Sequence, residues 1–146
     1  MEMPSDFKSA LEWADGRSEE LCRIYLRLAC CADEPSIGRL VRSVIHQKTG
    51  QAEILKTVRE SGEAARNPAV DLGLPPDVPC PAAEEPAAPA LLKAIREGES
   101  GMADVYIRLL EASTDSENRQ RLHALAETSR RFCAWARDHQ ELLSLF

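Results

Sequence analysis

The sequence predicts an all-α fold: a four-helix bundle of two antiparallel helical hairpins joined by a long proline-rich crossover. Apolar residues recur at intervals of three and four through four stretches of the 146-residue chain. Seven of the nine prolines lie in a single segment between the second and third stretches. The stretch IYLRL at 24–28 returns as VYIRL at 105–109, which is 81 positions later. These observations indicate two related helical hairpins.

The first predicted hairpin covers 5–61, with helices over about 5–32 and 36–61. The breaker DEPS separates them, and Asp33 or Ser36 is the predicted helix cap. The second hairpin covers 90–143, with helices over about 90–111 and 116–143 separated by STDS. Short breaks favour antiparallel neighbours, and no stretch alternates as a strand does. We therefore expect one all-helical domain over 1–146.

The segment 62–89 is predicted to have no regular helix or strand, because it contains PAVDLGLPPDVPCPAAEEPAAP. A helix of about 26 residues is about 39 Å long, and an extended proline-rich chain covers that length in about 13 residues. Roughly twice that number is present. The chain can therefore cross the bundle and begin the third helix parallel to the second, whereas an up-down-up-down bundle needs no long connection.

Composition limits the classes of function. Acidic residues outnumber basic ones 24 to 18, and no basic run is long enough to follow a phosphate backbone, so nucleic acid is not an expected partner. No run of about 18 apolar residues and no basic leader is present, which predicts a soluble cytoplasmic protein without a membrane partner. The five cysteines are odd in number and lack a C-x-x-C pair, which disfavours a disulfide framework or a zinc ribbon.

Polar residues interrupt the apolar seams at matching places in the two halves. The first helix steps through Phe7, Leu11, Ala14, Leu21, Tyr25 and Leu28, and the member that breaks this seam is Ser18. The third helix has Glu99 at the corresponding break, 81 residues later. Lys48 and Gln51 interrupt the second helix, and adding 81 gives Ser129 and Phe132 in the fourth. The repeat therefore aligns the polar breaks as well as the apolar residues, except at Phe132, which is apolar.

This pattern resembles the ferritin-like superfamily, and within it the rubrerythrin-like branch. The phrase GQAEIL at 50–55 is similar to the common EHAEIL of that branch, with Gln51 where the His stands. The resemblance covers both hairpins. It implies a four-helix bundle in which each half supplies a Glu and then a Glu-x-x-His, and these ligands converge on a di-iron or di-manganese centre.

Carried over position by position, the resemblance implies that five of the six metal ligands are replaced. Glu99 keeps the Glu of the second half, while Ser18 stands at the first Glu. The resemblance also places Tyr25 and Tyr106 just outside the ligands, although aromatic seam residues are ordinary core as well. We expect no cofactor, with iron or manganese as the alternative. The six positions form what we call the core site: Ser18, Lys48, Gln51, Glu99, Ser129 and Phe132.

Without a metal, Glu99 needs another partner. We expect the ammonium of Lys48 to neutralise it, with Ser18, Gln51 and Ser129 completing the hydrogen bonds. The open alternative is a different helix phase, in which Lys48 or Glu99 reaches solvent.

Three functions remain open at this stage, and none assigns a catalytic residue. The first is a ferritin-like binding or scaffolding subunit that has lost its dimetal centre, expected to be a homodimer that also binds an unidentified protein partner. Trp13 and Trp135 lie outside the strict seams and either cover the flank of the bundle or anchor the dimer.

The second function is an iron- or manganese-dependent oxidoreductase or peroxidase with a rearranged site at Glu99, His123 and Glu127.

The third function is a cysteine-based redox sensor. Its candidate thiols are Cys30, Cys31 and Cys133, and it requires a depressed thiol pKa.

Overall fold

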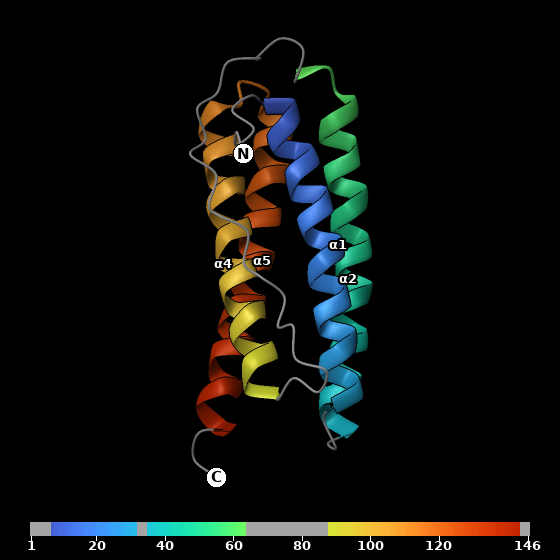
Figure 1. Ribbon diagram of the computed structural model, residues 1–146. Helices are drawn as coiled ribbons and strands as arrows, with labels where there is room; N and C mark the ends of the chain where they lie inside the picture. Colours follow the sequence, from blue (N-terminus) through green and yellow to red (C-terminus); the bar gives the residue numbers. More distant parts are fainter. Residues whose placement is uncertain (1–6, 32–34, 64–87, 144–146) are drawn as a thin grey trace.

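The computed structural model describes residues 7–31, 35–63 and 88–143, which form four helices and no strand (Figure 1). The helices are α1 (Phe7–Cys31), α2 (Pro35–Glu60), α4 (Ala88–Ala112) and α5 (Ser116–Leu143). The prediction of an all-α four-helix bundle is confirmed. No helix in the described ranges combines the length and the apolar character that a bilayer span needs.

Two helices that have a proline in their first turn begin at residues other than the predicted ones. Helix α2 begins at Pro35, so Ser36 lies inside its first turn and the prediction of Ser36 as the cap is wrong. Asp33, the alternative cap, lies outside the described residues. Helix α4 begins at Ala88, two residues before the predicted start, and includes Pro89 in its first turn. Proline is accepted there because first-turn N–H groups have no partner within the helix.

The helices form a closed ring of antiparallel neighbours. Helix α1 contacts α2 and α4, and α5 contacts the same two helices. Figure 1 shows that α2 and α4 run in the same direction, opposite to α1 and α5. The second and third predicted helices therefore run parallel to each other. Most of the predicted crossover, residues 64–87, lies outside the described residues.

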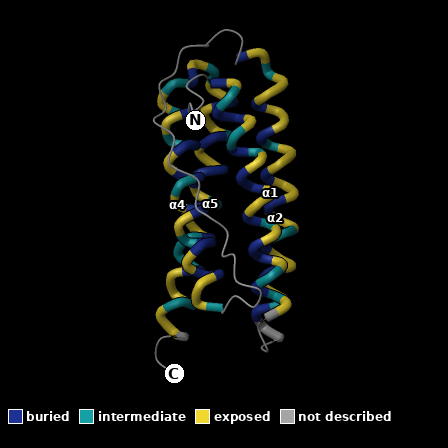
Figure 2. The backbone as a smooth tube through the Cα atoms, viewed as in Figure 1, coloured by how far each residue is buried: buried dark blue, intermediate teal, exposed yellow. Residues whose placement is uncertain are grey.

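The core lies where the apolar seams meet along the bundle axis, and buried residues follow the inward side of each helix (Figure 2). Every described seam residue named above is buried, and Tyr25 and Tyr106 are among the largest fully buried side chains. At Gly98 of α4 the helices approach closely, because an added Cβ would lie 2.6 Å from Cδ2 of Leu21 in α1. Trp13 and Trp135 are partly buried and pack against the core.

A buried carboxylate ties the end of α2 to the turn between α4 and α5. Glu63 is 0% exposed and accepts hydrogen bonds from Nδ2 of Asn118 at 2.6 Å, Oγ of Ser113 at 2.7 Å and the backbone N–H of Thr114 at 2.7 Å. Burial raises the pKa of Glu63, whereas these hydrogen bonds lower it. The hydrogen bonds have the larger combined effect, so the pKa lies below its ordinary value. The sequence pattern does not predict this contact.

Candidate functional site

The heptad positions bring all six core-site residues into the bundle interior. The exposed fractions are 2% for Lys48 and 0% for Glu99, so the alternative in which either residue reaches solvent is wrong. The physical reason is the helix phase: both residues occupy the seam, one turn from apolar neighbours that are themselves buried. The other four members are also buried: Ser18, Gln51, Ser129 and Phe132.

An ion pair between α2 and α4 occupies the centre of the site. Nζ of Lys48 donates a hydrogen bond to Oε1 of Glu99, as predicted. The same Nζ lies 5.3 Å from the ring centroid of Phe132 on α5, a cation–π distance. The ammonium therefore has a carboxylate on one helix and an aromatic ring on another.

The remaining hydrogen bonds of the site differ from the prediction. Nε2 of Gln51 donates to the backbone carbonyl of Leu125 at 3.4 Å, so the amide points toward the backbone of α5. Within the described residues, Oε2 of Glu99, Oε1 of Gln51 and Oγ of Ser129 have no hydrogen-bond partner. The expectation that Gln51 and Ser129 complete the bonding of Glu99 is therefore wrong.

Burial also sets the protonation of the site. Burial raises the pKa of Glu99, while the charge and the hydrogen bond of Lys48 oppose that rise. Burial likewise raises the pKa of Tyr25 and Tyr106, and the nearby charge of Glu99 adds to the effect. Both phenols are therefore neutral, and neither is prepared to act as a base near neutral pH.

Tyr25 connects the core site to the flank of the bundle. Its ring centroid lies 6.3 Å from that of Phe132 and 6.3 Å from that of Trp135. Trp135 in turn packs on His139 with centroids 4.6 Å apart. These contacts favour the interpretation of Trp135 as a cover of the flank.

The donor set does not fit a dimetal centre. Of the six positions only Glu99 supplies a carboxylate, and the Lys48 ammonium is bonded to it. Across 7–31, 35–63 and 88–143, no group of three or more His, Cys, Asp or Glu side chains is arranged to hold a metal ion.

The rearranged metal site is not assembled either. Glu99 is fully buried, whereas His123 and Glu127 are exposed, and Glu127 pairs with Arg130 at 3.0 Å. The structure therefore separates the three side chains that this alternative requires.

Cys133 lacks the activation that a redox sensor needs. Burial raises the pKa of the Cys133 thiol, so the expectation of a depressed pKa there is wrong. The pKa of the Cys22 thiol is raised for the same reason. Cys30 is exposed, and the side chain of Cys31 lies outside the described part of the chain.

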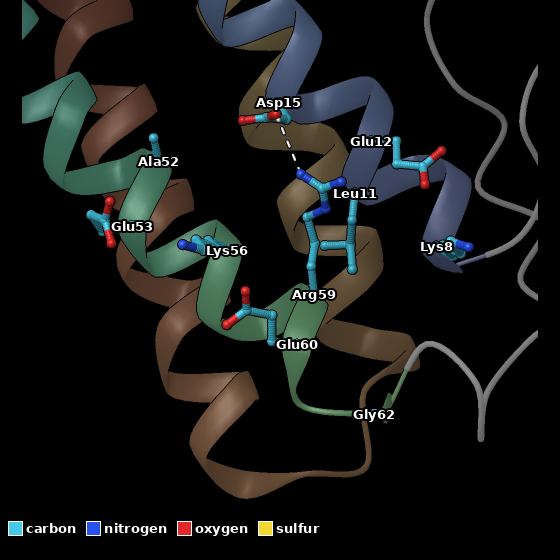
Figure 3. A pocket seen from close by; sticks show the side chains of 10 residues that line it. All are labelled: Lys8, Leu11, Glu12, Asp15, Ala52, Glu53, Lys56, Arg59, Glu60 and Gly62. Atoms are coloured by element: carbon cyan, nitrogen blue, oxygen red, sulfur yellow. Dashed lines mark hydrogen bonds and ion pairs between the residues drawn. The ribbon is translucent and has the colours of Figure 1, made fainter.

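A surface groove of about 680 Å³ lies between the first half of α1 and the second half of α2 (Figure 3). Arg59 pairs with Asp15 across it at 3.3 Å. Its charged lining comprises four acidic and three basic side chains, a near balance that favours neither anions nor cations: Glu12, Asp15, Glu53, Glu60, Lys8, Lys56 and Arg59.

Comparison of the chain with protein-family models, with curated proteins and with solved structures found no match.

Proposed function

We propose that this chain is a ferritin-like, rubrerythrin-like bundle that has lost the dimetal centre and acts as a binding or scaffolding subunit. The observation that supports this function best is the buried ion pair between Lys48 and Glu99. The pair involves the one carboxylate retained among the six ligand positions that the resemblance implies. The proposal includes a cytoplasmic homodimer that binds a further protein.

The chemistry of the pair explains why metal binding is disfavoured. A metal ligand must present a free lone pair, and a cation bound to Glu99 would lie beside the positive charge of Lys48. The side chain of Phe132 supplies no donor atom, and Gln51 offers an amide oxygen in place of the imidazole nitrogen that the resemblance implies. The core site therefore joins helices and supplies no Lewis acid.

The first experiment measures metal content by plasma mass spectrometry. The protein is purified without chelator and measured before and after anaerobic incubation with Fe(II) or Mn(II). We expect less than about a tenth of an equivalent per chain, whereas about two equivalents would indicate an intact dimetal centre and contradict the proposal.

A variant with rebuilt ligands provides the positive control. If the six positions match those of metal-binding relatives, restoring the missing ligands creates a site that binds Co(II) with visible d–d absorption. A folded rebuilt variant that binds no Co(II) would contradict the ferritin-like part of the proposal, while leaving the metal-free state of the parent intact. The substitutions are Ser18→Glu, Lys48→Glu, Gln51→His, Ser129→Glu and Phe132→His.

The oligomer is tested separately by sedimentation equilibrium over a wide concentration range. We expect the mass of two chains. A single-chain mass at every concentration would remove the homodimer from the proposal. The rearranged metal site is not proposed, because Glu99 lies apart from His123 and Glu127. A redox sensor at Cys133 is not proposed, because burial raises the pKa of that thiol.

A further inference from the structure

Four polar atoms near the Lys48–Glu99 pair are buried without a protein partner in the described ranges. They are Oη of Tyr25, Oε1 of Gln51, Oε2 of Glu99 and Oγ of Ser129. The exposed fraction of each of the four residues is 5% or less. Natural cores leave few such atoms unsatisfied, so four of them in one region require an explanation.

Contacts place these atoms around one level of the bundle. Glu99 bonds to Lys48, whose Nζ lies 5.3 Å from the Phe132 centroid, and the Tyr25 ring lies 6.3 Å from the same centroid. Gln51 lies one helical turn after Lys48 and donates to a carbonyl on α5. Ser129 is one turn before Phe132 on that same helix. All four helices therefore face one polar region.

The chemistry of this region suits a neutral guest. The charges of Lys48 and Glu99 cancel formally, so no net charge is left to hold an ion. Oε1 of Gln51 accepts only, whereas the hydroxyls of Tyr25 and Ser129 donate and accept. The Lys48 ammonium has two N–H groups beyond the one given to Glu99. Water is the smallest molecule that both donates and accepts, and buried water typically bridges such groups.

We propose that the core site holds enclosed water, which bridges Glu99, Gln51, Ser129 and Tyr25 across the four helices. The inference goes beyond the proposed function, because it depends on unsatisfied atoms and applies to a scaffold or to any other activity. Bridged in this way, each of the four groups stabilises the fold. Left dry, each would destabilise it.

Removal of single hydroxyls distinguishes a core site that holds water from a dry one. Tyr25→Phe and Ser129→Ala delete hydroxyls with little change in shape, and urea unfolding gives the equilibrium constant. If water bridges the hydroxyls, each deletion increases the unfolding constant by roughly 2- to 12-fold, the range of one net hydrogen bond. An unchanged or smaller constant for Tyr25→Phe overturns the proposal, because deleting an orphaned hydroxyl relieves a penalty.

Ser129→Ala needs a matched control, since Ala favours helix over Ser. Ser100→Ala supplies it, because Ser100 is exposed in the interior of α4. The effect of the Ser129 hydroxyl is the factor by which Ser129→Ala increases the unfolding constant of the parent, divided by the corresponding factor for Ser100→Ala. A ratio above about 2 supports the bridge, and a ratio of one or less contradicts it.

A direct measurement is oxygen-17 magnetic relaxation dispersion on the parent protein, which counts waters that stay longer than the protein tumbles. We expect an amplitude of at least one long-lived water. An amplitude of zero in the folded parent overturns the proposal whatever the metal measurements give, so this result and a failure of the proposed function are distinguishable.

Discussion

Replacing Lys48 with Met removes the only charge bonded to the Glu99 carboxylate among the described residues and keeps most of the side-chain volume. Breaking a buried ion pair by losing one partner costs about 3 to 5 kcal/mol. Protonation of Glu99 limits that loss, because an unpaired buried carboxyl takes up a proton. Neutralising a carboxyl with an ordinary pKa of about 4.3 costs about 1.4 kcal/mol per pH unit, hence about 3 to 4 kcal/mol at pH 7 and about 1 kcal/mol at pH 5.

The sign of the pH dependence follows from the folded state. Without Lys48, burial alone sets the pKa of Glu99 and holds it above the unfolded value. The folded variant then binds more protons than the unfolded chain, so its stability is highest below the unfolded pKa and falls as the pH rises toward the folded pKa. We therefore expect the stability difference between parent and Lys48→Met to grow with pH.

The assay is urea unfolding at several pH values, supported by thermal melts. A loss of about 3 kcal/mol at pH 7 corresponds to a fall in Tm of roughly 10 °C for a domain of this size. Lys56→Met is the matched control, because Lys56 is exposed on the same helix, and we expect a change within about 0.5 kcal/mol. Adding Glu99→Gln to Lys48→Met should recover part of the loss. A loss at Lys48→Met that equals the control, or that does not vary with pH, would refute the reasoning.

Two further predictions concern contacts away from the ion pair. Glu63→Gln should lower the free energy of unfolding by about 1 to 3 kcal/mol at pH 7, because it removes an ionised acceptor. Since the folded pKa of Glu63 is lowered, the parent should lose this stability as the pH falls below the unfolded pKa. Urea titrations from pH 7 to 3 should therefore show a smaller acid loss in the variant than in the parent. Gly98→Ala should destabilise by up to about 2 kcal/mol, because the new methyl meets Leu21 at 2.6 Å and the overpacking cost of about 1 to 3 kcal/mol outweighs the helix-propensity gain of about 1 kcal/mol. Its control, Gly50→Ala, should stabilise by up to about 1 kcal/mol, since nothing lies within 4 Å there; equal thermal shifts for the two would contradict this account.

Sequence periodicity predicts the fold well where local signals agree with it. The breaker STDS and the apolar repeat predict a helix over 116–143, and α5 has these bounds. The same repeat predicts that Lys48 and Glu99 lie inside the bundle, because a seam position is buried whatever residue occupies it. Their opposite charges then make the ion pair the expected contact.

Periodicity does not determine contacts that depend on rotamers or on the helix ends. The amide of Gln51 bonds to α5 because of a local choice of side-chain direction, and a seam pattern contains no such information. Glu63 lies beyond the last seam residue of α2, and the partners of its carboxylate are at least 50 positions away in the chain. Such contacts form only after the hairpins meet.

The two hairpins carry opposite charges at the core site, and we expect this difference to make their packing specific. The first hairpin contributes Lys48 and no acid to this level, and the second contributes Glu99 and no base. Two copies of the first hairpin would bury two ammoniums without a carboxylate, and two copies of the second would bury two carboxylates without an ammonium. Unpaired buried charges cost several kcal/mol each, so both like pairings are disfavoured, and only the first hairpin packed on the second gives a neutral core. We therefore expect the ion pair to favour the correct hairpin partner even if an apolar pair of similar shape would give equal stability.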